Sequence, residues 1–155
     1  MIGDVRELYQ AMILDHGRRP RNFGRLQSAT GSAEGFNPLC GDRVTVFVRV
    51  EDGVLRDITF EGQGCAICTA SASMMTERLK GHPLDEVERV FQRFHELVVN
   101  GAKPDDGADL AKLAVFEGVR AFPVRIKCAT LAWHALRSAL QPSSGEPGKG
   151  VSPHE

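Results

Sequence analysis

Four cysteines are the residues of this chain with the most chemistry to offer, and all four stand at the ends of expected elements. Cys40 precedes a run of alternating valines, with Gly41 and Asp42 directly after it. Residues two apart in an extended segment point the same way, so Cys40 and Asp42 can face one metal ion together. Gly41 between them lets the backbone bend close.

Cys65 and Cys128 offer two further thiolates from distant parts of the chain. Cys65 follows residues 62–64 (GQG), where a helical pattern begins, and the N–H groups and dipole of a helix start stabilise a thiolate. Cys128 lies early in the last expected helix, after Pro123, where the same argument applies more weakly. Three thiolates and one carboxylate would form a tetrahedral site of the kind that suits zinc or iron–sulfur units. From spacing alone, scattered buried cysteines remain an alternative.

The bulk composition excludes several classes of function. The chain has 155 residues and a formal net charge of −1, which predicts one domain without broad attraction to nucleic acid or anionic membranes. No apolar run approaches the ~20 residues that span a bilayer. Asp4 and Glu7 interrupt the pattern of a secretion signal. We therefore expect a cytoplasmic protein, whose cysteines serve as metal ligands or reactive thiols rather than disulfides.

An amphipathic helix is predicted over residues 4–16. Asp4 and Glu7 form a capping box, apolar residues follow at helical spacing, and Gly17 can end the helix. Residues 18–24 (RRPRNFG) then form a basic loop. This loop is either a solvated connector or a docking surface for an acidic partner.

The central strands are predicted from alternation with a period of two. Valines alternate with other residues over 43–50, and the apolar residues of the next run share one parity. A three-residue turn at 51–53, with its glycine left-handed, sets Val46 opposite Ile58 and keeps one apolar face. We expect that turn rather than a two-residue turn.

Helical patterns fill most of the remaining chain. They run from Cys65 to Gly81, from Pro83 to Val98, near 108–116, and from the region of Cys128 to Leu140. A third strand is expected over residues 30–36, and a loop over 100–107. This order predicts an α+β domain over residues 1–140, in which a small three-stranded antiparallel sheet carries helices on one face. Residues 141–155 are rich in Pro, Gly and Ser and are predicted to be a disordered tail.

The motifs of this chain resemble the IscU/NifU-N family, and most closely its SufU branch. The matching segments are 37–42 (NPxCGD), 62–65 (GxGC) with 70–75 (ASASMM), 125–133 (RIKCATLAW), and DH at 15–16 with PRNFG at 20–24. They occur in the family's order over roughly residues 5–140. The resemblance implies iron–sulfur cluster assembly with sulfur received from a cysteine desulfurase. It also implies the ligands Cys40, Asp42, Cys65 and Cys128.

Three departures separate the chain from IscU proper. Lys127 stands where IscU has a histidine before its last cysteine, and residues 122–125 (FPVR) stand in place of the LPPVK chaperone-binding motif. The stretch around residues 100–120 is also longer. All three features resemble SufU, so an IscU-type Hsp70 partner is not expected.

Two more residues carry hypotheses. Cys68 stands where both branches usually lack a cysteine, three positions after Cys65 and hence on a neighbouring face of the helix. It is a small buried residue, a ligand that can swap into the site, or a sulfur relay thiol. Arg125 adds positive charge near Cys128. With Cys40 it is the candidate catalytic residue, placed to steer a persulfide or contact the desulfurase.

Three functions are open from the sequence. In sulfur relay, zinc holds the thiolates. Once one ligand has left the metal, a SufS-like cysteine desulfurase passes persulfide sulfur to Cys40. The protein would then be a zinc-dependent sulfurtransferase. In the scaffold hypothesis, iron replaces zinc and the site holds a transient [2Fe–2S] cluster for apo iron–sulfur proteins or a downstream SUF scaffold. The third is a structural zinc module that binds a macromolecule, and the lack of a basic stripe disfavours it. The missing histidine favours relay.

Overall fold

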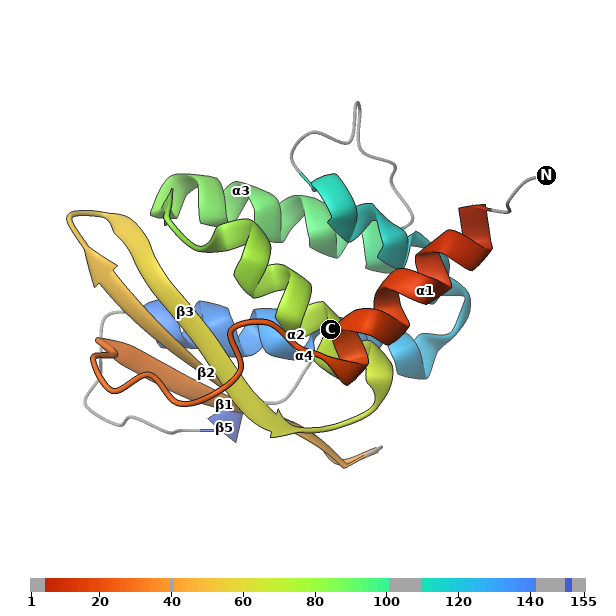
Figure 1. The fold of residues 1–155 in the computed structure, drawn as a ribbon, viewed down its shortest axis with the longest axis horizontal. Coiled ribbons are helices and arrows are strands. Elements are labelled where there is room, and N and C mark those ends of the chain that lie inside the picture. Colours follow the sequence, from red (N-terminus) through yellow and green to blue (C-terminus); the bar gives the residue numbers. More distant parts are fainter. Residues whose placement is uncertain (1–4, 40, 101–109, 142–149, 152–155) are drawn as a thin grey trace.

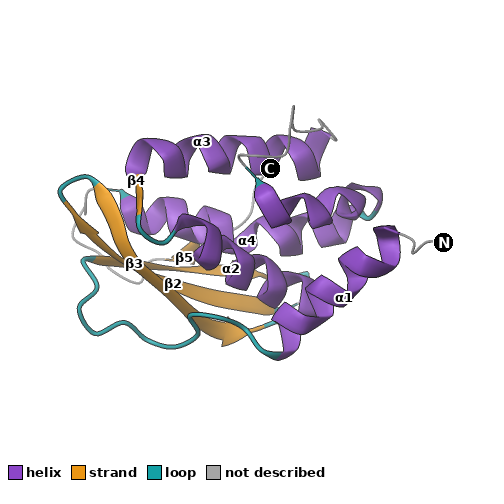
Figure 2. Cartoon of the chain, turned by 45° about the horizontal axis from the view of Figure 1, so that its top comes forward, coloured by secondary structure: helices purple, strands orange, loops and turns teal. Residues whose placement is uncertain are grey.

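The computed structural model describes residues 5–39, 41–100, 110–141 and 150–151, and it forms a sheet with a layer of helices on one face (Figures 1 and 2). The strands are β1 (Gly31–Asn37), β2 (Asp42–Glu51), β3 (Val54–Gln63), β4 (His82–Pro83) and β5 (Gly150–Val151), in the order β4-β3-β2-β1-β5. The helices are α1 (Val5–Arg18), α2 (Ala66–Leu79), α3 (Leu84–His95), the π-helical η1 (Glu96–Asn100), the 3-10 helix η2 (Ala111–Ala121) and α4 (Pro123–Leu140).

The predicted α+β class and the helices on one face are confirmed, whereas the predicted sheet of three strands is too small. β1, β2 and β3 pair antiparallel as expected, β4 adds an antiparallel partner to β3, and β5 runs parallel beside β1. Each added strand has two residues, which is too short to leave an alternation pattern in the sequence. β5 falls within the stretch predicted to be disordered. The rest of that stretch beyond residue 141, and the expected loop after residue 100, lie outside the described residues.

The hairpin between β2 and β3 keeps one apolar face by a different device from the predicted one. Its turn has two residues, Asp52 and Gly53, with φ of 54° and 73°, which is the type I′ pattern. The predicted three-residue turn is wrong, but the left-handed Gly53 is confirmed. Val46 lies opposite Phe60, because a β-bulge further along the hairpin shifts the register by one residue. A bulge is decided by pairing in the folded sheet, so the alternation alone could not reveal it.

The core lies between the sheet and helices α2 and α4. Gly35 of β1 allows α4 to come close, since a Cβ there would lie 3.0 Å from Leu131 Cδ1. Trp133 of α4 is buried in this core and stacks on Phe94, with ring centroids 4.4 Å apart. Phe122, which precedes the first turn of α4, is 62% exposed.

The first helix is longer than predicted. It continues to Arg18, so Gly17 lies inside α1 rather than ending it. A Cβ at Gly17 would lie 3.3 Å from Ala66 Cβ, so the glycine lets the end of α1 pack on the start of α2. The predicted capping residue Asp4 lies outside the described residues.

The basic loop after α1 is anchored rather than a solvated connector. The Arg21 N–H donates to Ser73 Oγ at 2.9 Å, and its guanidinium pairs with Asp15 at 2.8 Å. Asn22 donates to Thr76 Oγ1 at 3.0 Å. The loop therefore fixes α1 against α2, and its role as a docking surface stays a prediction.

His16 is buried at the centre of this anchor. Its Nδ1 lies 2.7 Å from Ser73 Oγ, and its Nε2 lies 3.8 Å from the Glu77 carboxylate. Burial lowers the pKa of His16 below its usual 6.5, and the charge of Arg21 lowers it further, against opposing effects of Glu77 and Asp15. Folded protein therefore resists protonation of His16 more than the unfolded chain does.

The free energy of unfolding should consequently fall as the pH drops through about 6.5, because the unfolded chain then gains a proton that folded His16 does not take up. Above about pH 6.5, His16 is neutral in both the folded and the unfolded protein, so this loss of stability does not occur. His16→Gln keeps a hydrogen-bond acceptor without titrating, so it should flatten this part of the pH dependence. Urea unfolding at several pH values measures the free energy of unfolding. If it falls with decreasing pH equally in wild type and variant, His16 is not the group responsible.

Candidate metal centre

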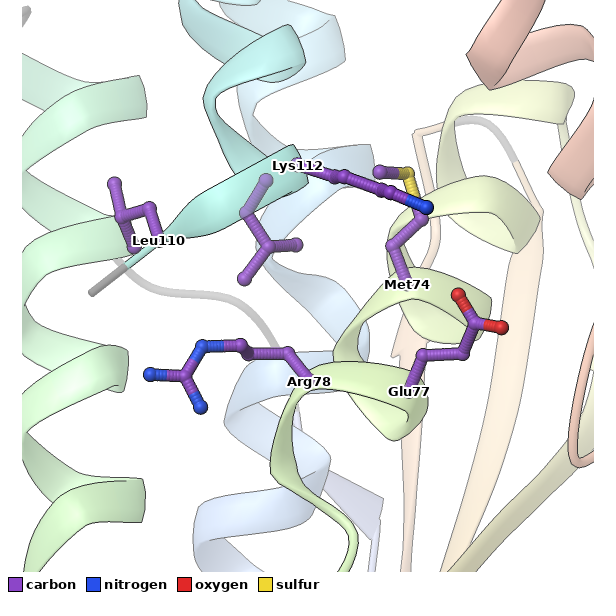
Figure 3. Close-up of a pocket in the computed structure, with 6 residues that line it drawn as sticks. Met74, Glu77, Arg78, Leu110 and Lys112 are labelled. Atoms are coloured by element: carbon purple, nitrogen blue, oxygen red, sulfur yellow. The ribbon is translucent and has the colours of Figure 1, made fainter. Parts of the chain in front are cut away.

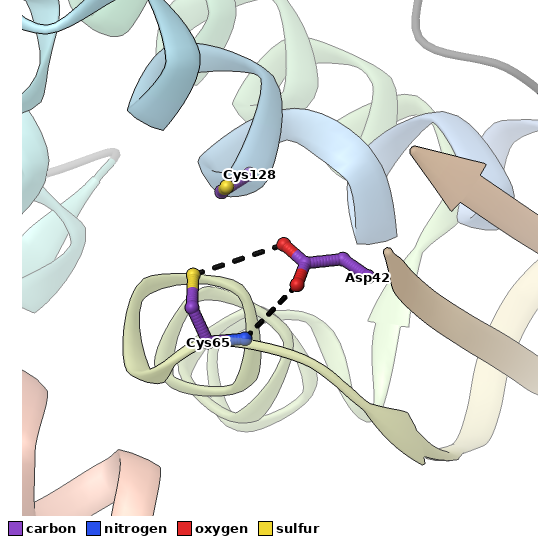
Figure 4. A group of neighbouring side chains, drawn as sticks. All are labelled: Asp42, Cys65 and Cys128. Carbon is purple, nitrogen blue, oxygen red and sulfur yellow. Dashed lines mark hydrogen bonds between the residues drawn. The ribbon is translucent and has the colours of Figure 1, made fainter. Parts of the chain in front are cut away.

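Three side chains from three elements meet near the start of α2 (Figure 4). Asp42 begins β2, Cys65 is the N-cap of α2, and Cys128 lies in the second turn of α4. One carboxylate oxygen and the two Sγ atoms all lie within 4.8 Å of one another. The structure thus brings together three of the four predicted ligands. Cys40, the fourth, lies outside the described residues.

Hydrogen bonds hold the described residues of the turn between β1 and β2 in place. Asn37 pairs with Asp42 across the hairpin, and its carbonyl accepts the Gly41 N–H at 2.8 Å. The Asn37 side chain accepts the Leu39 N–H at 3.1 Å, and Gly41 has a φ of 75°, which a glycine adopts without strain. Leu39 and Gly41, the neighbours of Cys40 in the chain, are both exposed.

Asp42 is held against the start of α2 by a backbone hydrogen bond. The Cys65 N–H donates to Asp42 Oδ1 at 3.0 Å, while Asp42 Oδ2 lies 3.7 Å from Cys65 Sγ. A Cβ on Gly64 would lie 2.9 Å from Asp42 Oδ1. Gly64 therefore makes room for the carboxylate, a role that the sequence pattern did not reveal because it depends on a contact between distant segments.

Gly64→Ala should weaken zinc binding about 10- to 100-fold, because the added methyl pushes the carboxylate away from the Cys65 N–H. The carboxylate is the free end of a side chain, so we expect a stability cost of only about 1 kcal/mol or less. Competition with a chromophoric chelator and urea unfolding measure the two effects. An unchanged zinc affinity would show that Asp42 does not need this space.

The environment of Cys65 favours a thiolate. A hydrogen bond with the Cys128 thiol, aided by the N–H groups of Cys68 and Ile67, lowers the pKa of Cys65 from its usual 9.0 to about 6. Burial and the charge of Asp42 oppose that shift. The Cys68 N–H lies 3.4 Å from Cys65 Sγ, which is the bond that a helix start gives to its N-cap side chain.

The buried carboxylate of Asp42 favours a bound cation at this site. Its side chain is 2% exposed and lies beside a thiolate, and among the described residues no Lys, Arg or His forms an ion pair with it. A buried carboxylate is costly unless it is paired or binds a metal. Two sulfur atoms and one oxygen, with Cys40 nearby in the chain, suit a zinc ion in number and type.

The two remaining candidates take different places. Cys68 is buried in the core, as a small buried residue would be, and its thiol is not part of the group formed by Asp42, Cys65 and Cys128; its roles as a replacement ligand or relay thiol stay predictions. Arg125 is exposed in the first turn of α4, three residues before Cys128. Its role toward a persulfide or a partner stays a prediction.

A buried serine behind the site connects the helices that carry the two thiols. Ser71 of α2 donates to the Ala129 carbonyl oxygen of α4 at 2.6 Å and accepts the Trp133 indole N–H at 3.0 Å. Ala129 directly follows Cys128. Ser71 therefore fixes the spacing of α2 and α4, and sequence patterns missed it because serine within a helical run gives no sign of its partner.

Ser71→Ala should lower the free energy of unfolding by about 1–3 kcal/mol, because it leaves the buried Trp133 N–H without an acceptor. Trp133 is the only tryptophan in the chain, so its fluorescence follows urea unfolding directly. Ser28→Ala, in an exposed turn, is the control. Equal midpoints for the two variants would contradict the role of Ser71.

A pocket of about 330 Å³ lies elsewhere, between α2 and the start of η2 (Figure 3). Its lining residues are Met74, Glu77, Arg78, Leu110, Lys112 and Leu113. Met74 is nine residues beyond Cys65, which is about 14 Å along a helix. The pocket is therefore separate from the metal centre.

This fold and the thiolate–carboxylate site define a class of protein. Residues 8–129 match the family described as the NifU-like N-terminal domain, and the chain belongs to that family. In the described ranges, none of the helices combines the length and the apolar character needed to cross a membrane.

Three individual proteins are similar to this chain over most of its length. The chain is 38% identical to the zinc-dependent sulfurtransferase SufU of Bacillus subtilis, covering 89% of this chain and 92% of that protein. It is 36% identical to the iron–sulfur cluster assembly scaffold protein IscU of Streptococcus pyogenes, covering 92% and 89% of the two chains. A solved structure of a putative scaffold protein for the SUF system from Fervidobacterium islandicum is 30% identical, with a TM-score of 0.79 over 89% of this chain and 100% of that chain.

Proposed function

We propose that this protein accepts persulfide sulfur from a cysteine desulfurase at a zinc–thiolate site and passes it into iron–sulfur cluster assembly. The observation that carries the proposal is the meeting of Asp42, Cys65 and Cys128 within 4.8 Å, with the buried carboxylate lacking a cation among the described residues. The similarity to a zinc-dependent sulfurtransferase supports it.

The four ligands in this proposal are Cys40, Asp42, Cys65 and Cys128. Zinc bound to them would neutralise the clustered negative charge and keep the thiols deprotonated. The chain prepares the site by its own contacts, since the Cys65 N–H orients Asp42 and the Cys68 N–H faces the Cys65 sulfur. The iron–sulfur cluster itself would be cargo rather than a resident cofactor.

Cys40 is the sulfur acceptor in this proposal. Cys128 is 2% exposed, and Cys65 is half-buried at the N-cap of α2. Leu39 and Gly41 on either side of Cys40 are exposed, so a partner can approach this part of the hairpin. The Cys40 thiolate would attack the outer sulfur of the desulfurase persulfide, the S–S bond breaks, and the desulfurase keeps a thiolate while Cys40 carries the new persulfide.

The surroundings of the site suit a protein partner. Leu39, Phe122 and Val124 are 69%, 62% and 50% exposed, and they belong to the segments that carry Cys40 and Cys128. Arg125 adds an exposed cation beside Val124. We propose that these residues meet a SufS-like desulfurase in the cytoplasm, with Arg125 attracting the anionic persulfide.

Assembly of a transient [2Fe–2S] cluster on the same ligands is the second candidate function. The relatives named as IscU scaffold proteins favour it, and a hard carboxylate among soft thiolates would keep such a cluster labile enough to hand to apo-proteins. The two functions need the same residues but differ in what arrives first, sulfur or iron.

A desulfurase assay with the zinc form separates them. Relay predicts a several-fold faster turnover of cysteine, which Cys40→Ala abolishes while Cys68→Ser preserves it. Unchanged turnover, together with a transferable cluster formed from iron and sulfide under anaerobic conditions, would establish the scaffold function instead.

A further inference from the structure

We propose that Cys65 and Cys68 form a redox-active dithiol, which a low-molecular-weight disulfide such as oxidised glutathione converts to an intrahelical disulfide. The two cysteines form a Cys-x-x-Cys sequence (CAIC), with Cys65 at the N-cap of α2 and Cys68 in its first turn. This is a second use of Cys65, in addition to its place in the metal centre, and it requires no persulfide.

The local geometry already brings the two residues together. Cys65 has an extended backbone, with φ −71° and ψ 169°, and its side chain folds back over the first turn of the helix. Its Sγ lies 3.4 Å from the backbone nitrogen of Cys68. The Cβ atom of Cys68 is only two bonds from that nitrogen. Residues three apart within a helix have Cβ atoms about 5–6 Å apart, and a disulfide needs about 3.5–4.5 Å. A small movement of Cys65, which lies outside the helix proper, would close that gap.

Exposure sets the order of the two steps. Cys65 is half-buried and reachable, whereas Cys68 is 3% exposed. The Cys65 thiolate first attacks oxidised glutathione, which forms a mixed disulfide and releases one glutathione thiolate. The Cys68 thiol then loses its proton and attacks the Cys65 sulfur, which releases the second glutathione thiolate. The two cysteines lose two electrons and two protons in total, and one oxidised glutathione becomes two reduced molecules.

Cys128 is the competing partner for Cys65, since their thiols are hydrogen-bonded. Cys128 belongs to α4, however, and Ser71 holds α4 at a fixed spacing from α2. A disulfide between Cys65 and Cys128 would have to draw their Sγ atoms, which lie within 4.8 Å of each other, to about 2 Å across two separate helices that this contact ties together. Cys68 shares the helix of Cys65, so its disulfide leaves the packing of α2 and α4 unchanged.

The consequence concerns the metal centre. A disulfide between Cys65 and Cys68 removes one thiolate from the ligands, so the oxidised protein should hold zinc far more weakly than the reduced protein. A dithiol reductant restores the ligand. The dithiol thereby couples the zinc occupancy of the site to the thiol–disulfide balance of its surroundings.

Trypsin separates the cysteines for a direct test. Cleavage after Arg and Lys leaves Cys40 in peptide 26–43, Cys65 with Cys68 in peptide 57–78, and Cys128 in peptide 128–137. The full-length, zinc-free protein is treated with oxidised glutathione, alkylated and digested without reductant. In wild type, peptide 57–78 should lose two hydrogen atoms and carry neither glutathione nor alkyl groups. In Cys68→Ala, the same peptide should instead keep one glutathione on Cys65.

Several results would overturn the proposal. One is a disulfide that joins peptide 57–78 to peptide 128–137 or 26–43. Another is glutathione that stays on Cys65 of the wild type. The third is alkylation of both Cys65 and Cys68. The wild-type result decides even if Cys68→Ala folds poorly, because peptide 57–78 contains only these two cysteines. Zinc competition gives a second readout, in which the oxidised wild type should bind zinc at least about 100-fold more weakly and recover after reduction. Unchanged affinity of the oxidised protein would contradict the link to the metal centre.

Discussion

Cys65→Ser is expected to weaken zinc binding by at least about 100-fold, because the variant removes a ligand whose supporting contacts alone are worth 10- to 100-fold in such sites. The pKa of the Cys65 thiol is lowered to about 6, so this side chain is already a thiolate at neutral pH, before any metal binds. Serine keeps the size and the N-cap hydrogen bond but supplies a much poorer ligand. Competition with a chromophoric chelator measures the change.

Cys68→Ser is the matched control for this experiment. It changes the same atom on the same helix, at a buried position outside the group of ligand atoms, and should leave zinc affinity nearly unchanged. If Cys65→Ser retains zinc and only the double variant loses it, Cys68 replaces Cys65 as a ligand. The predicted ligand set would then be wrong at that position.

Gly62→Ala is expected to lower the free energy of unfolding by about 3 kcal/mol or more. Gly62 has a φ of 143°, a conformation that is essentially restricted to glycine, and a Cβ there would overlap the carbonyl oxygen of Arg43. Gly62 pairs with Val44 in the sheet, so the strands must separate to relieve the overlap. Urea unfolding followed by tryptophan fluorescence measures the loss.

Gly118→Ala supplies the comparison for that variant. Gly118 lies in η2, and a Cβ there meets nothing within 4 Å. This substitution should change stability by no more than about 1 kcal/mol. Similar unfolding midpoints for the two alanine variants would show that the strands tolerate a side chain at Gly62.

The sequence could predict the parts of the site that depend on local pattern. Cys65 at a helix start, Cys128 early in the last helix and Asp42 at the head of a strand were each expected, and the structure brings these three together. Alternating valines likewise predicted a strand buried on one face. These features are carried by periodicity and by glycine or proline signals within a few residues.

The features that the sequence did not predict depend on contacts between distant segments. The bulge in the hairpin, the two-residue strands and the space that Gly64 leaves for Asp42 are decided only when the chain is folded. Phe122 is aromatic, yet it is exposed beside the start of α4. A single aromatic residue carries no local signal that separates a buried position from an exposed one.

Mapping the persulfide sulfur tests the central claim most directly. The zinc-loaded protein is incubated with a SufS-like desulfurase and cysteine, alkylated and digested with trypsin, and the three cysteine peptides are weighed. The account predicts one extra sulfur atom on peptide 26–43, which contains Cys40, and none on that peptide in Cys40→Ala. Extra sulfur on 57–78 or 128–137 alone, or on no peptide while the desulfurase remains active, would contradict the role of Cys40 as the sulfur acceptor.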